Sequence, residues 1–351
     1  MRGSALVIGA GIAGTAAARG LLRAGWSVQI LERNAAVPGS GTALGMWPEA
    51  MRALDALGAV SMVRAGSVER SGARILRPDG SEIAALGKGR AARLVPRTVL
   101  LEALADELPA ETIQWNFPVT GPESLPHADV VIAADGISSR LRTAQFGIRP
   151  RPLGTVAFRG TVPGPTGEVS ETWGPGRLFG ITPLDHQNTN WFACFRSGDP
   201  MLSALGTDLS PEALQSRAGE ILGRLYRNWH PEVGRVLGQL DGNPVDYREL
   251  SDIPRLPSYV FGRTALLGDA AHGMAPNLGR GACEALLDAA ALVEALAAAP
   301  DAGTALHRYD ANRRRRGTRM VLMARLLNRA STAGKFTTVR NAAVSAAARF
   351  S

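Results

Sequence analysis

The stretch GDAAHGMAPNLGRGACEAL, residues 268–286, places an Asp, a His and several glycines between an apolar strand pattern and an Ala/Leu-rich helical pattern. In α/β proteins, loops between a strand and the following helix hold ligands, because strand ends and helix N-termini converge there. Asp269 is the polar group that such a loop presents, while His272 has no second His at metal-ligand spacing and is expected to be structural. The stretch therefore predicts a ligand-binding loop.

A second ligand-binding pattern lies at the N-terminus, in ALVIGAGIAGTAAARGLLRAGWSVQILER. It predicts a strand at 5–8, a helix at 12–24 and a strand at 27–31, with glycines in the first turn. Such a turn lets the backbone approach a pyrophosphate at the helix N-terminus, and an acid at the end of the second strand accepts hydrogen bonds from a ribose. The unit predicts dinucleotide binding by Gly9, Gly11, Ala13, Gly14, Glu32 and Arg33.

Two further motifs identify a family. Asp135, Gly136, Ser139 and Arg142 form a DGxxSxxR pattern after an apolar strand, and the 268–286 stretch matches a second flavin signature. With the N-terminal motif, the chain resembles the class A FAD-dependent monooxygenases of the para-hydroxybenzoate hydroxylase fold. Softer patterns at 41–58, 95–104 and 158–163 resemble the salicylate and urate hydroxylase-like branch.

The resemblance implies roles for single residues. Glu32 would bind the ribose, Arg97 the phosphate and ribityl side of FAD, and Asp269 the ribityl chain. Asp135 would lie near the pyrophosphate, although a loop ion pair or cap is the alternative for Asp135 and Arg142. The backbone around Gly279, Gly281 and Ala282 would approach the flavin ring, with Pro276 beside it; Pro276 and Arg177 are the candidate catalytic residues.

Arg280 stands where the family commonly has Gln. It could alter the flavin position, contact an anionic substrate or point to solvent.

The activity implied by the resemblance is a monooxygenation. NAD(P)H would reduce FAD, O₂ would add at the flavin C4a, and one oxygen atom would hydroxylate or epoxidise a small organic substrate, whether aromatic, heterocyclic or polyketide-like. The protein would bind the ring and exclude water, with no obligatory general base. Two alternatives stay open: an FAD-dependent dehydrogenase or non-redox cyclase on the same fold, and a non-catalytic flavin-binding interaction protein.

The expected architecture is α/β, a Rossmann-like FAD-binding domain with an inserted mixed β-sheet substrate domain and C-terminal helices. We assign 1–72, 91–150 and 255–351 to the FAD-binding domain, and 73–90 and 151–254 to the substrate domain. A Pro-Asp-Gly turn within 73–86 predicts a hairpin, and 211–227 predicts a helix. Alternation places Trp191, Ala193 and Phe195 on one strand face and Phe192 and Cys194 on the other. Candidates for the substrate pocket are Arg159, Arg177, Trp173, Phe179 and Trp191.

The composition limits other functions. The net charge of +8 comes with dispersed arginines, apart from the run at 313–316, which is expected to be solvated rather than to bind nucleic acid. The two cysteines, Cys194 and Cys283, cannot make a disulfide framework, and a reducing cytoplasm fits them. No metal site, no membrane-spanning segment and no membrane partner are expected, and the protein is expected to be soluble.

Replacing Glu32 tests the dinucleotide assignment. Glu32→Ala is expected to weaken FAD retention, because the ribose hydroxyls would lose their carboxylate acceptor. The dissociation constant of FAD, measured by fluorescence titration, checks this. An unchanged constant would show that Glu32 does not contact the ribose.

Overall fold

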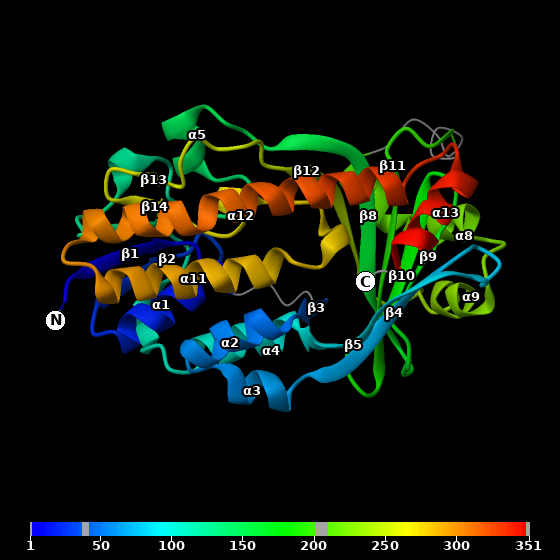
Figure 1. The fold of residues 1–351 in the computed structure, drawn as a ribbon, viewed down its shortest axis with the longest axis horizontal. Coiled ribbons are helices and arrows are strands. Elements are labelled where there is room, and N and C mark those ends of the chain that lie inside the picture. Colours follow the sequence, from blue (N-terminus) through cyan, green and yellow to red (C-terminus); the bar gives the residue numbers. More distant parts are fainter. Residues whose placement is uncertain (1, 37–41, 201–209, 349–351) are drawn as a thin grey trace.

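Two β-sheets organise the chain (Figure 1), and the computed structural model describes residues 2–36, 42–200 and 210–348. The first sheet has six strands in the order β13-β14-β7-β1-β2-β6, and the second has eight in the order β12-β8-β11-β10-β9-β4-β5-β3. The architecture is therefore α/β with a second, mixed sheet, as the sequence predicts.

The first sheet is mainly parallel. Its strands are β1 (Ser4–Ile8), β2 (Ser27–Leu31), β6 (Ile113–Gln114), β7 (Val130–Ala133), β13 (Val260–Phe261) and β14 (Thr264–Leu266). β1 pairs in parallel with both β2 and β7, and β14 pairs in parallel with β7, so the carboxyl ends of β1, β7 and β14 meet at one edge. These three strands precede the three sequence motifs, which therefore lie together.

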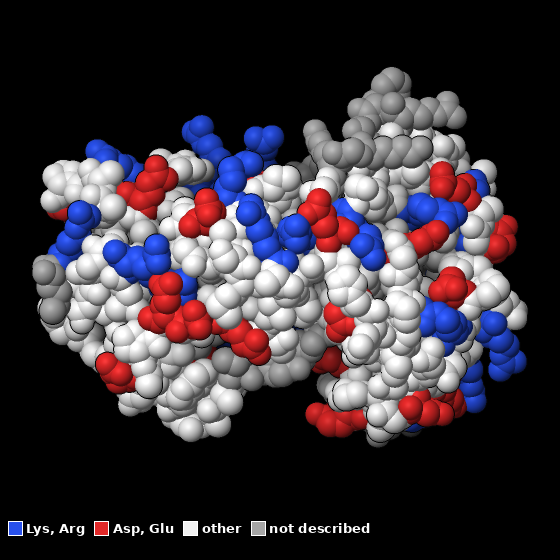
Figure 2. All heavy atoms as spheres, turned by 90° about the horizontal axis from the view of Figure 1, so that it is seen from below, with Lys and Arg blue, Asp and Glu red and all other residues white. Residues whose placement is uncertain are grey.

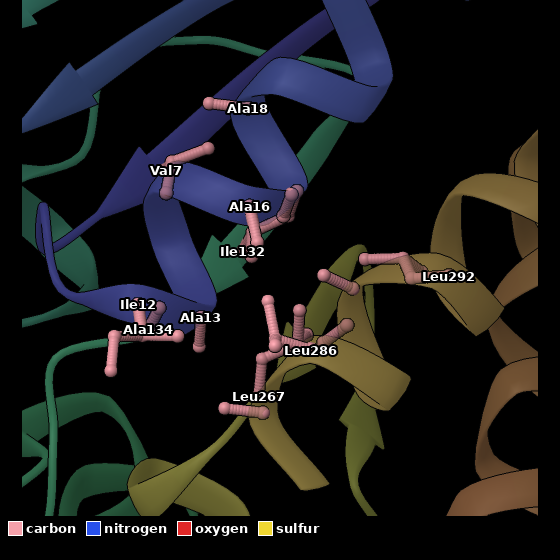
Figure 3. Packing of buried hydrophobic residues seen from close by; sticks show 14 of the residues in the cluster. Val7, Ile12, Ala13, Ala16, Ala18, Ile132, Ala134, Leu267, Leu286 and Leu292 are labelled. Atoms are coloured by element: carbon pink, nitrogen blue, oxygen red, sulfur yellow. The ribbon is translucent and has the colours of Figure 1, made fainter. Parts of the chain in front are cut away.

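Small side chains allow close packing around this edge. Helix α1 (Ile12–Arg23) follows β1, and α11 (Gly281–Ala298) packs beside it. Figure 3 shows Ala13, Leu267 and Leu286 in one cluster, contributed by α1, the end of β14 and α11. A Cβ built on Gly268 would lie 2.9 Å from the Cβ of Ala13. The N-terminal motif and the 268–286 loop are thus in van der Waals contact.

The second sheet carries one covered face. Its strands are β3 (Ala43–Met46), β4 (Val68–Leu76), β5 (Glu82–Pro96), β8 (Arg151–Pro163), β9 (Ser170–Trp173), β10 (Arg177–Pro183), β11 (Asn188–Arg196) and β12 (Val245–Asp252). Trp191, Ala193 and Phe195 pack into a cluster with α8 (Ala218–Leu225) and α9 (Pro231–Leu237), while Phe192 and Cys194 belong to another cluster. The predicted alternation along β11 is confirmed.

The hairpin predicted at 73–86 forms from β4 and β5. The single helix predicted at 211–227 is wrong, because the chain forms α7 (Pro211–Ser216) and α8 with a break between them. Arg217 leaves helical geometry there, at φ −101° and ψ 14°. The break turns Leu214 and the apolar face of α8 onto the same cluster.

One long helix joins the two sheets. α12 (Ala302–Ser331) runs beside α11 and continues to the second sheet (Figure 1). Arg325 on α12 forms an ion pair of 2.6 Å with Asp252 of β12, and Asn328 accepts a hydrogen bond of 3.1 Å from Thr155 of β8. α12 therefore fixes the sheets relative to each other.

The remaining helices are α2 (Pro48–Ala56), α3 (Val60–Ala65), α4 (Arg97–Ala105), α5 (Arg140–Phe146), α10 (Asp269–His272) and α13 (Thr337–Ala348), with short 3₁₀ turns at Ala110–Thr112, Pro122–Ser124 and Pro276–Leu278. No helix in the described ranges is long and apolar enough to cross a bilayer.

The two glycines of the N-terminal turn make a matched pair for mutation. A Cβ at Gly14 would lie 2.0 Å from the carbonyl oxygen of Gly9, whereas a Cβ at Gly11 would meet nothing within 4 Å. Gly14→Ala is expected to lower the free energy of unfolding of the FAD-free protein by about 1–3 kcal/mol through overpacking. Gly11→Ala should cost less in the same urea titration. Equal losses in both variants would contradict this packing.

Candidate functional site

The turn after β1 presents unpaired donors. Gly11 caps α1 without any side-chain hydrogen bond, and no acidic residue occupies the first turn of the helix. The first backbone amides of a helix have no acceptor within it, and its dipole places partial positive charge there. The start of α1 can therefore bind an anionic group such as a pyrophosphate, and the space around Gly11 leaves room for it.

Glu32 is held beside this turn. Its carboxylate accepts hydrogen bonds from the backbone N–H of Ala10 at 2.7 Å and from the backbone N–H and Nδ2 of Asn34 at 2.9 and 2.7 Å. A carboxylate has about four acceptor positions, so one stays available for a ribose hydroxyl. Arg33 is exposed next to it.

Asp269 and Arg97 lie close enough to interact electrostatically. Burial raises the pKa of Asp269, and the positive charges of His272 and Arg97 oppose that rise. Water nevertheless reaches Asp269, which is among the exposed residues. The side chain of Asp269 is therefore accessible to a ligand.

Arg97 has an orphaned donor. Its Nε is buried and has no hydrogen-bond partner among the described residues. Burial lowers the pKa of the guanidinium, and the nearby Arg159 lowers it further, while Asp269 opposes both. Because an unsatisfied buried donor costs about 1–3 kcal/mol, this group is suited to a hydrogen-bond acceptor from a ligand.

Asp135, which follows β7, has a buried acceptor without a partner. Its Oδ2 accepts a hydrogen bond of 2.9 Å from the backbone N–H of Arg140, but its Oδ1 is buried and unpaired among the described residues. Arg142 has a structural role, because its guanidinium donates to the carbonyl oxygens of Ile137, Ile148 and Ala270. Arg142 thereby fixes the loop that carries Asp135 against α10.

The start of α11 is open in the same way. A Cβ built on Gly279 or Gly281 would meet nothing within 4 Å, and Gly279 has φ +60°, which favours glycine. Arg280 caps the helix without a side-chain cap bond, so the amides of Gly281, Ala282 and Cys283 keep their donors. The Sγ of Cys283 donates to the carbonyl oxygen of Gly45 at 3.1 Å, which fixes β3 beside this turn.

Asp288 anchors the loop from inside. Its carboxylate accepts hydrogen bonds from the backbone N–H of Gly268 at 2.9 Å and from Arg313 Nε at 2.7 Å, and its Oδ2 lies 2.6 Å from His272 Nε2. Burial would raise the pKa of Asp288, but His272 and Arg313 outweigh burial and lower it. Burial would lower the pKa of His272, but the interaction with Asp288 is stronger than the effect of burial, and the pKa is raised. His272 therefore supports the loop through Asp288, while its Nδ1 is buried without a partner among the described residues.

Arginines extend this anchor into a network. Glu284 is fully buried and accepts from Arg313 at 2.7 Å, from Arg316 at 3.1 Å and from Arg280 at 3.1 Å. Arg280 also pairs with Glu49 of α2 at 2.6 Å. Of the alternatives considered for Arg280, pointing to solvent is wrong, because its guanidinium is bound to the carboxylates of Glu49 and Glu284.

The expectation that residues 313–316 are solvated is wrong for Arg313. Its side chain is only 4% exposed, because it lies between α11 and α12 with two carboxylates. A run of arginines on a helix looks solvated in sequence, but a helix turns by about 100° per residue and directs one member of the run inward.

Amide side chains hold the turn that contains Pro276. Asn277 Nδ2 donates to Ser331 Oγ at 3.1 Å, and Asn328 Nδ2 donates to Asn277 Oδ1 at 3.1 Å. Pro276 itself is exposed. The turn is therefore attached to the end of α12, and through Asn328 and Thr155 to the second sheet.

The structure does not bring Arg177 to this group. Its guanidinium donates to the carbonyl oxygen of Leu225 at 2.7 Å and pairs with Asp199 at 2.9 Å. In the β10–β11 register Arg177 is paired with Phe195, whose face of the sheet is covered by helices. Phe179 and Trp191 lie on that covered face too, so neither lines a pocket on the other side.

The opposite face of the second sheet points toward β3, since Asn190 accepts a hydrogen bond of 3.1 Å from the backbone N–H of Ala43. Phe192 and Arg159 are directly paired on this face, and Arg159 forms an ion pair of 2.7 Å with Asp246. Glu171 shares the face through the β9–β10 register, and burial raises its pKa although Trp173 donates a hydrogen bond to it.

The sequence predicted the residues of three loops but missed their supports. The structure brings Gly11, Asp135, Asp269, Gly281 and Arg97 to one edge. Asp288, Glu284, Arg313, Asn277 and Asn328 were missed, and so was Glu171. Only Glu284 and Asp288 had a clear signal, as carboxylates inside the Ala/Leu-rich helical pattern 281–298. Within the described residues, no group of three or more His, Cys, Asp or Glu is placed to bind a metal ion.

These residues fit FAD. Two uncapped helix N-termini supply donors for a pyrophosphate and for a polar ring edge, Glu32 has an acceptor position for a ribose, and Arg97 Nε and Asp135 Oδ1 need partners. The open space at Gly11, Gly279 and Gly281 allows backbone to approach a planar ring.

The comparisons with known proteins agree with this fit. A family model described as FAD binding domain matches residues 2–119 and 240–324. The aurachin C monooxygenase/isomerase of Stigmatella aurantiaca is 30% identical over 88% of this chain and 84% of its own. The 3-amino-4-hydroxybenzoate 2-monooxygenase PtnB3 of Streptomyces platensis is 31% identical over 87% of this chain and 82% of its own.

A solved structure is also similar. HpxO of Klebsiella pneumoniae, complexed with FAD and uric acid, matches with a TM-score of 0.83 and 25% identity, covering 99% of this chain and 93% of its own. The match spans both sheets.

Removing the Asp288 charge tests the anchor. Asp288→Asn is expected to lower the free energy of unfolding of the FAD-free protein by about 3 kcal/mol, because Arg313 loses a buried carboxylate. Urea titration at pH 6 measures this, with exposed Asp55→Asn as the matched control.

The pH dependence gives a second check. The raised pKa of His272 means that its stabilisation is present below its ordinary value of 6.5 and is lost as the pH rises through the folded-state value. The lowered pKa of Asp288 means that its stabilisation is present above 3.8 and is lost as the pH falls through the folded-state value. The deficit of Asp288→Asn should therefore narrow between pH 6 and pH 9. A deficit that does not change over this range would contradict the His272–Asp288 pair.

Proposed function

The chain belongs to the FAD-binding family of class A flavoprotein monooxygenases and is an oxidoreductase, and we propose that it uses NAD(P)H and O₂ to oxygenate a small organic substrate. The proposed reaction converts NAD(P)H, a proton, O₂ and the substrate into NAD(P)⁺, the oxygenated product and water. One oxygen atom enters the substrate and the other leaves as water.

One observation carries the proposal: among the described residues, unsatisfied polar groups of the three motifs lie at one edge of the first sheet, and Arg97, at the start of α4, adds another that interacts with Asp269. They are Arg97 Nε, Asp135 Oδ1 and the uncapped amides of α1 and α11. Unsatisfied buried groups are rare in folded proteins, so their convergence supports a resident polar cofactor. When bound, FAD supplies the transfer of two electrons from NAD(P)H and the activation of O₂.

The residues of the chain would bind and orient this cofactor. The N–H groups at the start of α1 and the carboxylate of Glu32 would hold the pyrophosphate and a ribose, and Asp269 would accept from the ribityl hydroxyls. The N–H groups of Gly281 and Ala282 at the start of α11 would favour negative charge at the near end of the ring. Pro276, in the turn fixed by Asn277, would pack against the ring.

The face of the second sheet that carries Phe192 and Glu171 supports a substrate class. Phe192 offers an aromatic surface, while Asp246 neutralises Arg159. Glu171 adds an acceptor, because Trp173 holds only one of its carboxylate oxygens. We propose an aromatic or heteroaromatic substrate that carries a hydroxyl, amino or ring N–H group, in line with the aminohydroxybenzoate named for one relative.

Anaerobic reduction tests the proposed function. Purified FAD-loaded protein is mixed without O₂ with NADH or NADPH, in the presence and absence of candidate aromatic substrates. Loss of the oxidised flavin absorbance is expected, faster with the correct substrate. Admission of air should restore the absorbance and give a product that gains one oxygen atom by mass spectrometry.

Three outcomes would contradict the proposal. Flavin that the substrate itself reduces, without NAD(P)H, indicates a dehydrogenase. A product formed without any redox change indicates a cyclase. Flavin that no nicotinamide nucleotide reduces across the panel indicates a binding role. Asp269→Ala should lose FAD and with it the reduction, whereas the exposed Asp55→Ala should behave as wild type.

A further inference from the structure

The solvent-facing side of α12 combines exposed apolar and basic side chains. Leu322, Met323 and Leu326 are 52%, 52% and 51% exposed. At about 100° per residue, these three and the exposed Arg315, Arg319 and Arg329 all fall within a sector of about 120°. We call these six residues the α12 face.

The arginines of the α12 face differ from their neighbours on the same helix. Arg313, Arg314, Arg316 and Arg325 form ion pairs with carboxylates. Arg315, Arg319 and Arg329 form none within the described ranges, and α12 has no acidic residue after Asp310. Arg315 and Arg319 therefore carry positive charge that no ion pair in the described ranges offsets, while Arg329 is near enough to Asp252 to interact with its charge. Elsewhere the signs are mixed: Figure 2 shows Lys and Arg interspersed with Asp and Glu on the side seen from below.

The apolar residues need a separate explanation. Three adjacent large side chains, each about half exposed on one helix face, form a contiguous patch, since positions three and four apart are neighbours on a helix. Single exposed apolar residues are normal, but contiguous patches mark interaction sites. Because these three residues lie between Arg319 and Arg329 along α12, the apolar patch and the arginines form one continuous surface.

A second copy of this chain fits the face poorly. A twofold contact places the same patch on both subunits, so arginines would face arginines with no acid on either side. A protein partner is the other occupant of such a surface, because Met and Arg are common in protein interfaces, and wild type that does not float with vesicles would favour it.

We propose that the α12 face docks the protein on an anionic lipid bilayer. Leu322, Met323 and Leu326 would enter the boundary between headgroups and acyl chains, and Arg315, Arg319 and Arg329 would bind lipid phosphates. Apolar and basic residues share one sector of α12, so the long arginine side chains would have to extend to the headgroups while the neighbouring apolar side chains enter the boundary. The face is separate from the residues that would hold FAD, so docking is independent of the proposed reaction.

Vesicle flotation tests the docking. FAD-loaded full-length protein is mixed with vesicles of phosphatidylcholine alone, or of equal parts phosphatidylcholine and phosphatidylglycerol. Wild type should float with the anionic vesicles and remain behind with the neutral ones, and high salt should weaken the association. Arg315→Gln/Arg319→Gln/Arg329→Gln should reduce partitioning on the order of 100-fold, at about a factor of five per Arg. Leu322→Ser/Leu326→Ser should reduce it about 10-fold or more.

Arg52→Gln/Met62→Ser is the matched control. It removes an exposed Arg and a 43%-exposed Met from α2 and α3, which lie on the other side of the molecule from α12 (Figure 1). It should float as wild type. Bound FAD and thermal unfolding, measured for every variant, identify any that has lost its fold.

The proposal would be overturned if wild type does not float with anionic vesicles or floats equally with neutral ones. It would also be overturned if the control loses as much partitioning as the α12 variants, or if the α12 variants float as wild type does. Light scattering in the absence of lipid tests whether a second copy of this chain occupies the α12 face instead. A dimer that Leu322→Ser/Leu326→Ser dissociates would show that a second copy covers the face.

Discussion

The buried carboxylate of Asp288 holds three parts of the molecule in one place. It accepts from the backbone of Gly268 at the start of the 268–286 loop, lies against His272 and binds Arg313 of α12. Glu284 also pairs α11 with α12, and Asn277 bonds to the end of α12, but among the described residues Asp288 is the side chain that fixes the backbone N–H of Gly268. The position of Asp269, and of the glycines that follow it, depends on this interaction.

The support continues from Asp288 to both sheets. Arg313 also pairs with Glu284, and Glu284 pairs with Arg280. Arg280 in turn pairs with Glu49 of α2. At the far end of α12, Asn328 links Asn277 to Thr155 of the second sheet. The loop expected to contact the flavin is thus held at both ends by one long helix, so the distance between the two sheets is set together with the loop.

Local patterns were enough to predict the elements that carry the motifs. The strand, glycine turn and helix at the N-terminus, the hairpin of β4 and β5 and the alternation along β11 each follow from spacing within a few residues. Patterns over such short distances did not reveal the pairing partners. Arg313 looked solvated because its carboxylates are on another helix, and Arg177 looked available because Asp199 was not recognised as its partner. Glu171 was missed because only the register of β9 and β10 places it opposite Gly180, on the face that carries Phe192.

The central claim is that three separated segments form one FAD site. Hydrogen–deuterium exchange of the chain with and without FAD tests it directly, because bound cofactor slows exchange of the amides that it contacts or orders. Slower exchange is predicted at 11–15, 135–140 and 278–283 together. Protection confined to one of these segments, or found only elsewhere, such as in α13, would contradict the account.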